Sequence, residues 1–525
     1  MYHRRWAILA TMCLSLVLIV ATVSSVNVAI PSLAKSELTP TDTQILWIVD
    51  AYALVFAALL LPAGALGDRF GRKGALLIGL VIFAAASALS AVMTTPTGKK
   101  KTQKEINITA PLTTPTGLIL ARAVMGIGAA LIMPSTLSLL QSAFPPAERA
   151  KAIAIWAGFA GAGGAIGPLM GGFLLEHFWY GSVFFVAVPI AAIAFVASSI
   201  LAPRSKEGAG AALDPLGSML SIVGFGGLLF AIIEGPERGW SDALVVVGFV
   251  VAAVGLVGFV VYERRIAHPL LDMSYFGTPR FAMGALGITF TFLGMFSMFF
   301  VLTQSLQYVK GYTPLGAGVR GLPFAATMIV VSPRSADLAA RFGVRRVVGT
   351  GMTVFTVGLV MLSLVEVGTS YLYVVVCLVI AAAGVASTMP SLSAGIVQSV
   401  PMHKAGVGSA VNHTTRGGGG AIGIAVVGTV VTSGYRDHLS PALAVLPPEL
   451  ADVARDNVAK ALAVADQGRS VVGDEQADQL VAEVRQAFVD GAHVGLRIAA
   501  ALVMVAALVV VARVGTDDSY GARHH

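Results

Sequence analysis

The sequence predicts an all-α polytopic membrane protein with fourteen transmembrane helices. Residues of the apolar class make up 56% of the 525 residues and charged residues only 12%, and the mean hydropathy is +0.81. A soluble protein carries about 25% charged residues, so this chain lacks the polar surface that a soluble fold needs. Apolar runs of about 20 residues, the length that spans a bilayer, recur from one end to the other.

The predicted helices are taken from the hydropathy of the chain. They cover 6–30, 44–66, 74–94, 117–139, 151–175, 182–201, 216–234, 243–262, 281–305, 316–338, 347–366, 371–395, 405–433 and 488–512. An even number of spans places both termini on one side of the membrane. The first helix is interpreted as a retained helix and not as a removed signal peptide, because no small-residue cleavage site follows it.

Lysine and arginine predict the orientation of the helices. They are more frequent in the loops on the side of the N-terminus, which places both termini on the cytoplasmic side of the membrane. The net charge of +7 is therefore attributed to cytoplasmic loops and not to nucleic-acid binding. Cys13 and Cys377 both lie within apolar segments, where they predict neither a disulfide framework nor a metal site.

Two loops on the opposite side are unusual. In the segment 94–117, Thr94–Gly98 recurs verbatim as Thr113–Gly117 around a lysine-rich stretch. We interpret it as an inserted segment; a functional epitope is the alternative. The long loop 434–487 alternates apolar and charged residues and predicts short amphipathic helices outside the membrane. A solvated spacer is the preferred interpretation, and a lid over the exit is the alternative.

A short internal repeat predicts two homologous halves. Asp68-Arg69-Phe70-Gly71-Arg72-Lys73 follows the second helix, and Arg341-Phe342-Gly343-Val344-Arg345-Arg346 follows the tenth, with Asp337 just upstream. The predicted parts are an N-terminal six-helix bundle at 1–201, two linker helices at 202–280, a C-terminal six-helix bundle at 281–512 and a cytoplasmic tail at 513–525. Two such halves around a site at the membrane midplane are a transporter architecture.

Five motifs, in order along the chain, resemble the fourteen-helix drug:proton antiporter branch of the major facilitator superfamily, which contains multidrug and antiseptic exporters. They are Trp47–Tyr52, Gly67–Lys73, Arg122 with Gly126 and Gly128, Gly163–Gly172, and Gln304–Pro323. The resemblance covers essentially the whole chain. It implies a proton-coupled antiporter that exports amphipathic small molecules by alternating access and uses the proton gradient in place of a cofactor.

Ionisable residues within the spans are candidates for proton coupling, because a charge inside the bilayer is costly and usually faces a cavity. Asp50 lies where the branch signature places an acid, and a lone Arg122 has no lipid-facing rationale. His413 lies one turn before Arg416, and a histidine can change charge near physiological pH. We predict proton coupling by Asp50, Arg122 and His413. A structural pair is the preferred interpretation of Arg334 and Asp337.

The substrate cavity is predicted from polar and aromatic residues of the first, ninth and thirteenth helices. Its predicted residues are Thr22, Ser25, Asn27, Phe296, Gln304, Gln307, Asn412 and Arg416. Cation exporters of this branch usually carry an acid where this chain has Thr22, and they can carry acids in the thirteenth helix. The predicted cavity is therefore net positive, which favours neutral or anionic amphiphiles over permanent cations.

Two further groups of residues are assigned to the conformational change. A latch between the bundles is predicted from Asp68, Arg69, Gly71, Arg72, Lys73, Asp337 and Arg341. Close helix packing is predicted from Gly163, Gly167, Pro168, Gly171 and Gly172, because close approach of two membrane helices needs small residues.

Other classes of protein are less consistent with the sequence. No phosphate-cradling G-x-x-x-x-G-K-[ST] motif and no H-E-x-x-H motif occur, which disfavours an ATP-driven pump and a metalloenzyme. An exporter of a lipid or cell-envelope metabolite and a non-transporting sensor stay as alternatives. The expected partners are an amphipathic substrate, protons and the lipid bilayer, with no nucleic acid, and the functional unit is predicted to be a monomer.

Overall fold

The computed structural model describes residues 4–34, 38, 40, 42–94, 114–203, 214–267, 269–401, 404–439, 451, 454 and 458–513. Most of the predicted insertion at 94–117, the tail beyond 513 and part of the loop 434–487 lie outside the described residues, as does the side chain of Asn27. Within the described residues every regular element is a helix, and fourteen segments are long and apolar enough to span a membrane. The predicted fold class and number of spans are confirmed.

The first half of the chain forms seven helical elements, since the sixth span is broken into two helices. They are α1 (Arg5–Ala34), α2 (Asp42–Phe70), α3 (Arg72–Met93), α4 (Pro115–Ala143), α5 (Pro146–His177), α6 (Ser182–Phe185) and α7 (Ala187–Leu201). Glycines 126 and 128 of α4 let neighbouring backbones approach closely: a Cβ on Gly126 would lie 2.7 Å from the Tyr52 carbonyl oxygen, and one on Gly128 would lie 2.8 Å from that of Gly79.

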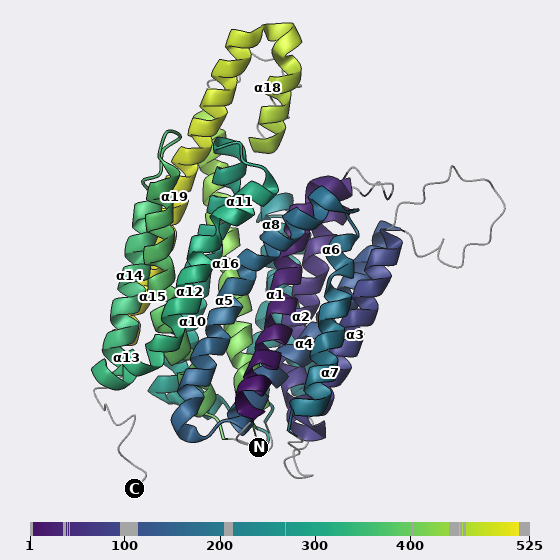
Figure 1. The fold of residues 1–525 in the computed structure, drawn as a ribbon, viewed down its shortest axis with the longest axis vertical. Helices are drawn as coiled ribbons and strands as arrows, with labels where there is room; N and C mark the ends of the chain where they lie inside the picture. Colours follow the sequence, from purple (N-terminus) through teal and green to yellow (C-terminus); the bar gives the residue numbers. More distant parts are fainter. Residues whose placement is uncertain are drawn as a thin grey trace, which may run out of the picture.

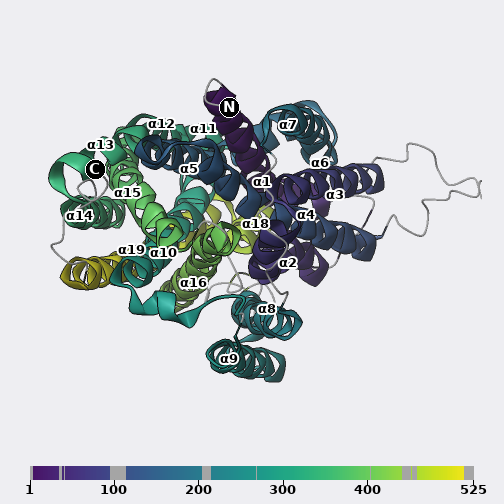
Figure 2. The ribbon, with the colours of Figure 1, turned by 90° about the horizontal axis from the view of Figure 1, so that it is seen from below.

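The linker helices are α8 (Pro215–Arg238) and α9 (Ala243–Glu263). Both begin at an aspartate N-cap, Asp214 and Asp242, whose carboxylate accepts a hydrogen bond from a backbone N–H of the first turn. The two helices pack against each other, and α8 also contacts α2 and α16 (Figure 2). The linker pair therefore lies outside the two bundles and contacts one helix of each.

The second half repeats the first with more breaks. Its elements are α10 (Pro279–Gln304), the π-turn η3 (Ser305–Val309), α11 (Pro314–Arg320), α12 (Leu322–Val331), α13 (Ser335–Phe342), α14 (Val344–Leu362), α15 (Tyr371–Gln398), α16 (Ala405–Leu439), α18 (Val458–Val472) and α19 (Asp474–Arg513). The tenth span consists of α11, α12 and α13, because Pro323 and Pro333 each remove a backbone donor from the helical ladder.

The last helix is longer than predicted. The sequence predicted a span at 488–512, whereas α19 has 40 residues and begins at Asp474. At about 1.5 Å per residue, α19 is about 60 Å long, which is about twice the thickness of the hydrocarbon core of a bilayer, about 30 Å. Its first turns pack against α18 in a hairpin that stands beyond the bundle (Figure 1). Gly473, at φ +89°, makes the tight turn, and Arg469 binds Asp478 across it at 2.6 Å.

The bundle thus has two distinguishable ends. We call the end with the Asp68–Lys73 turn the basic end and the end with the α18–α19 hairpin the hairpin end; Figure 1 shows the N-terminus and α13 at the first and α18 at the second. Between the two halves, α5 contacts α11, α12 and α15, and α16 contacts α2 and α4. Helices α5 and α16 therefore make the most extensive contacts between the halves.

Candidate functional site

Arg122 is the centre of the first buried polar group, the Arg122 cluster (Ile48, Asp50, Tyr52, Arg122 and Phe184). The arginine is fully buried on α4, and its Nε donates to the Ile48 carbonyl at 2.9 Å. The guanidinium lies over the Tyr52 ring at 4.7 Å, and the Asp50 carboxylate attracts it. Its Nη2 and the Tyr52 hydroxyl have no partner among the described residues. The structure therefore brings Asp50 and Arg122 together.

The aromatic contacts explain how a charge is tolerated here. Phe184, from α6, lies 5.9 Å from the guanidinium carbon. Aromatic faces attract a cation, and the interaction is strongest where water is excluded. Sequence reasoning did not assign Tyr52 or Phe184 to the site. Tyr52 belongs to the Trp47–Tyr52 motif and could have been found there, whereas Phe184 reaches Arg122 only through the tertiary fold.

A second buried group lies between the halves, the Arg416 cluster (Trp156, Phe292, Ser393, His413 and Arg416). The Arg416 Nη2 donates to the Ser393 hydroxyl at 2.9 Å. Its guanidinium lies 5.0 Å from the centre of the Trp156 ring and 5.2 Å from that of Phe292. His413 packs edge-on against Trp156, with ring centres 5.5 Å apart. Trp156 belongs to α5 and the other four to α10, α15 and α16, so the cluster joins the two halves.

The Arg416 cluster has unused hydrogen-bonding capacity. Four groups in this cluster or next to it have no hydrogen-bond partner among the described residues: the His413 Nε2, the Trp156 Nε1, the Arg416 Nε and the side-chain amide of Asn412, the residue before His413. All four side chains are at most 5% exposed. Because a buried polar group without a partner is costly, these groups are candidates for contact with a polar ligand group.

The glycines of α16 make one side of this helix accessible. A Cβ on Gly419 would lie 2.1 Å from the Thr289 carbonyl oxygen, and one on Gly420 would touch the Phe296 ring, so both pack against α10. No atom comes within 4 Å of a Cβ placed on Gly417 or Gly418. Phe296 is 38% exposed. The structure therefore leaves room for a side chain at Gly417 and Gly418, and the substrate cavity beside Arg416 and Phe296 stays a prediction.

The other predicted cavity residues lie elsewhere. Thr22 and Ser25 are buried on α1, and their hydroxyls donate to the Leu18 and Thr22 carbonyls of the same helix at 2.6 and 3.1 Å. Gln304 and Gln307 are both half-buried. Gln304 is the last residue of α10, and Gln307 lies within the π-turn η3. At 1.5 Å per residue, Gln304 lies about 18 Å along α10 from Phe292. A role for these four side chains in substrate binding stays a prediction.

The predicted small-residue face of α5 lies at helix contacts. A Cβ on Gly167 would lie 2.5 Å from the Ala21 carbonyl oxygen, one on Gly171 2.9 Å from that of Ser25, and one on Gly163 3.0 Å from the Val20 Cβ, all on α1. Gly172 instead meets Leu315 of α11, in the other half, at 2.8 Å. Three of these glycines hold α5 against α1, and the fourth closes the contact between halves. Pro168 lies inside α5 among them.

The basic end is closed by a contact that we call the Asp68 latch (Asp68, Arg72, Gly406 and Val407). The buried Asp68 carboxylate accepts a hydrogen bond from the Arg72 Nε at 2.9 Å. It also accepts bonds from the backbone N–H groups of Gly406, at 2.8 and 3.0 Å, and Val407, at 3.2 Å. These amides begin α16, where the helix dipole favours an anion. Asp68 therefore binds the first half to the second, as the latch requires.

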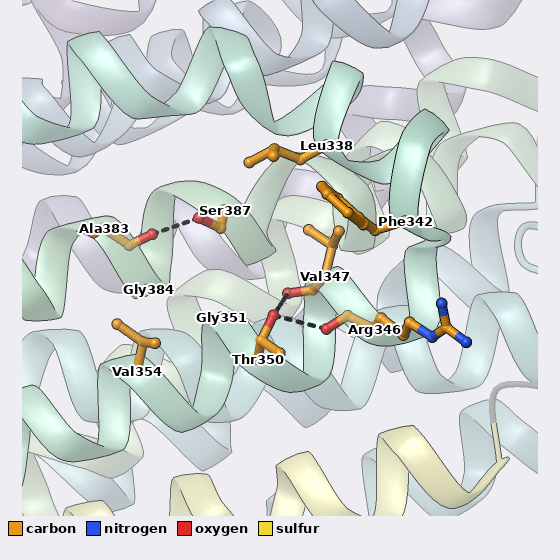
Figure 3. A pocket seen from close by; sticks show the side chains of 10 residues that line it. All are labelled: Leu338, Phe342, Arg346, Val347, Thr350, Gly351, Val354, Ala383, Gly384 and Ser387. Atoms are coloured by element: carbon orange, nitrogen blue, oxygen red, sulfur yellow. Dashed lines mark hydrogen bonds between the residues drawn. The ribbon is translucent and has the colours of Figure 1, made fainter.

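Sequence reasoning missed the α16 partner and assigned too many residues to the latch. Lys73 donates to the Ser199 carbonyl of α7 at 2.7 Å and so acts within its own half. The predicted contribution of Asp337 and Arg341 is corrected: both are exposed, Arg341 lies over the Phe342 ring, and no ion pair joins Asp337 to Arg334 or Arg341 in the described chain. The second turn lies beside a hollow of 440 Å³ that is lined by residues of α13, α14 and α15 (Figure 3).

Gly71 has a clear physical role in the latch. It adopts φ +111° between α2 and α3, a conformation that glycine adopts without strain. The reversal places Arg72, the first residue of α3, back over Asp68. Gly343 does the same at φ +83° between α13 and α14. The repeat seen in the sequence is therefore a repeated helix–helix turn, and only its first copy carries the latch.

We expect Asp68→Asn to weaken the latch, because an amide is a poorer acceptor for the α16 amides and leaves Arg72 without its carboxylate. The measurement is maleimide labelling of Ser409→Cys, a fully buried position on α16, in a background without Cys13 and Cys377. Labelling should increase several-fold. Lys73→Gln, which removes a basic residue of the same turn outside the latch, should leave labelling near the parent value. Equal labelling of all three proteins would contradict the assignment.

No metal centre is present in the described chain, where no group of three or more His, Cys, Asp or Glu side chains could hold a metal ion. The candidate site contains two buried guanidiniums that lie against aromatic rings, one buried histidine and one half-buried carboxylate, that of Asp50. Such groups can bind and release protons and can bind a polar ligand.

The comparisons with known proteins agree with this architecture. Residues 12–424 match the family described as Major Facilitator Superfamily. The chain is 35% identical over 508 residues to the multidrug efflux pump LfrA of Mycolicibacterium smegmatis, covering 97% of this chain and 96% of that protein. It is 32% identical over 495 residues to the multidrug resistance protein Stp of Mycobacterium tuberculosis, covering 91% and 86%. A tetracenomycin C resistance and export protein of Streptomyces glaucescens is 29% identical over 520 residues, covering 96% and 91%.

Solved structures share the fold at low sequence identity. The proton:xylose symporter XylE has a TM-score of 0.59 at 12% identity, covering 96% of this chain and 95% of that one. The human organic anion transporter MFSD10 has a TM-score of 0.57 at 13% identity, covering 96% and 99%. With two pseudo-symmetric bundles, two linker helices and a family match over most of its length, this chain belongs to the major facilitator superfamily of multi-pass membrane transporters.

Proposed function

We propose that the protein is a proton-coupled exporter of amphipathic small molecules, acting in multidrug efflux at a bacterial cytoplasmic membrane. The observation that carries the proposal is the Arg416 cluster, where unpartnered donors of α5 and α16 lie between the two halves. The names of the relatives, a multidrug efflux pump, a multidrug resistance protein and a tetracenomycin C resistance and export protein, support the same class of substrate. The basic end is proposed to face the cytoplasm, as the loop charges favour.

Alternating access gives each group a part in the proposed cycle. With the Asp68 latch closed, the basic end is sealed and the Arg416 cluster communicates with the hairpin end. Opening the latch separates α16 from α2 and exposes the cluster to the cytoplasm. The half-buried Asp50 and the fully buried Arg122, which lie close together, are the proposed site at which a proton enters and changes the balance between these two states.

The test is transport by the purified protein in proteoliposomes. An imposed pH gradient should drive uptake of a fluorescent amphiphile in inside-out vesicles, and substrate addition should cause a matching proton flux. Equal transport with and without the gradient, at zero membrane potential, would rule out proton coupling while leaving transport itself established. A set of amphiphilic drugs and of short-chain phospholipid analogues, assayed together, separates drug export from lipid export.

The proposed preference for the charge of the substrate follows from the Arg416 cluster. The Arg416 guanidinium belongs to the proposed cavity, and the Arg416 cluster contains no acid, so a permanent cation there would lose water and meet like charge. Neutral and anionic amphiphiles instead place an acceptor on Arg416 and their apolar part on Phe292 and Phe296. We therefore propose a preference for neutral or anionic substrates.

We expect Arg416→Ala to lower export of neutral and anionic amphiphiles about tenfold, the effect of losing roughly 1.4 kcal/mol of ligand binding, and to lower export of cations much less. Arg497→Ala, the same change at an exposed position of α19, serves as the matched control and should leave all three classes unchanged. Initial rates for cationic, neutral and anionic dyes of similar size provide the measurement. A wild-type preference for quaternary ammonium compounds that survives Arg416→Ala would contradict this cavity.

A further inference from the structure

Two buried carboxyl groups meet where the linker helices begin and end. Asp214 is the N-cap of α8 and is 7% exposed, and Glu263 ends α9 and is 3% exposed. A Cβ placed on Gly217 would lie 2.1 Å from the Asp214 Oδ2 and 2.4 Å from the Glu263 Oε1. The two oxygens therefore face each other over a glycine, in the space that any other side chain at 217 would occupy.

The other oxygen of each carboxyl is already bound. The Asp214 Oδ1 accepts from the Gly217 N–H at 2.8 Å, and the Glu263 Oε2 accepts from the Leu271 N–H at 3.2 Å. The facing oxygens receive no hydrogen bond from any donor in the described chain, yet the two carboxyls are close enough to hydrogen-bond to each other. A hydrogen bond between two carboxyls needs one proton, since two carboxylates have only acceptors.

No cation forms an ion pair with either carboxyl among the described residues. Arg264, the residue after Glu263, lines the hollow beside the pair, but no ion pair joins it to Asp214 or Glu263 there. Of the described groups, Asp214 is the one whose charge acts on Glu263. Tyr262 of α9 lies within hydrogen-bonding reach of Asp214 and is neutral. In the following loop, hydrogen bonds from Ser274 lower the pKa of Asp272, which is therefore ionised, and Lys404 attracts Asp272 and donates to the Pro269 carbonyl at 3.2 Å. Two like charges buried side by side are unfavourable, so one carboxyl of such a pair stays protonated.

We propose that Asp214 and Glu263 form a proton-binding site in which the two carboxyls share one proton and thereby hold the linker helices to the second half. No residue of the Arg122 or Arg416 cluster belongs to it, so the site is separate from the transport path. A hollow of 330 Å³, lined by Glu263, Pro269, Asp272 and Ser274 among others, lies against the pair at the basic end and lets water reach it.

The position of this pair connects the shared proton to the Asp68 latch. The Glu263 carboxyl accepts a hydrogen bond from the Leu271 backbone N–H, and the nearby Pro269 carbonyl accepts one from the Lys404 ammonium group. Lys404 stands two residues before Gly406, whose N–H binds Asp68 in the latch. Loss of the shared proton would set two carboxylates against each other and loosen the segment 269–271, and with it the start of α16. The protonation state of the Asp214–Glu263 pair therefore changes the equilibrium between the closed and open forms of the Asp68 latch.

Infrared spectroscopy of the purified protein tests the shared proton directly. A protonated carboxyl has a C=O stretch, shifted by D₂O, that carboxylates lack. Wild type should show a component of this band that is absent from both Asp214→Asn and Glu263→Gln, because in each variant an amide N–H replaces the shared proton and the remaining acid is ionised. Asp272→Asn, in the same loop, should retain the component. A band that persists in either single variant of the pair overturns the proposal.

Thermal stability gives a second readout that does not depend on transport. The folded pair holds a proton that the unfolded chain releases above a pH of about 4, so its stabilisation is present at low pH and is lost as the pH rises. The apparent Tm of wild type should therefore fall relative to that of Glu263→Gln between about pH 5 and about pH 9, and the variant should be the more stable at the alkaline end. Parallel curves for the two proteins overturn the proposal even if export is proton-driven.

Discussion

Gly406→Ala is expected to abolish export and leave the basic end open. A Cβ at this position would lie 2.5 Å from the Gly64 carbonyl oxygen and 2.7 Å from the Asp68 carboxyl group. Backbone oxygen cannot move aside as a flexible side chain can, so the α2–α16 contact cannot close. The reciprocal contact is equally tight, since a Cβ on Gly64 would lie 2.6 Å from the Gly406 carbonyl oxygen.

The same helix offers a matched control for this substitution. Gly417→Ala and Gly418→Ala add the same methyl group to α16 where no atom lies within 4 Å, and they should retain most of the activity. Transport rates and Ser409→Cys labelling from the basic side are measured together. For Gly406→Ala we expect transport below about one tenth of the parent and maximal labelling. Parent-like transport by this variant would show that the halves do not close through this contact.

Arg122→Gln is expected to uncouple transport from protons. The variant keeps a donor for the Ile48 carbonyl but loses the charge that lies over Tyr52 and is attracted by Asp50. A desolvated cation–aromatic contact is worth about 2 kcal/mol, which corresponds to more than about tenfold in an equilibrium constant. Substrate-dependent proton flux should fall by at least that factor.

The uncoupling is distinguished from unfolding by substrate exchange. Counterflow in proteoliposomes without a gradient needs an intact Arg416 cluster but no proton movement, so it should persist in Arg122→Gln. Tyr52→Phe retains the aromatic face and removes the unpartnered hydroxyl, and we expect both activities to survive in it. If Arg122→Gln keeps wild-type proton flux, the proton site lies elsewhere in the molecule.

Much of the architecture was predictable from the sequence, because the thickness of the bilayer sets the length and apolar composition of each helix separately. A helix must be about 20 apolar residues long whatever its neighbours are, so the fourteen spans could be counted without knowing how they pack. The broken tenth span and the π-turn after α10 were not predicted, since proline effects and local backbone compression depend on neighbouring helices. The long α19 was missed because its first turns are polar and are held by α18, outside the membrane.

For the candidate site, the sequence by itself determined which side chains are anomalous: an arginine, a histidine or an aspartate inside a span is costly wherever it lies, so Asp50, Arg122, His413 and Arg416 could be identified individually. Only the tertiary structure decided their partners. Trp156 lies more than 250 residues from His413, and Asp68 lies 338 residues from Gly406. These contacts form where the two halves meet, and residue spacing within a helix carries no information about the helix that packs against it.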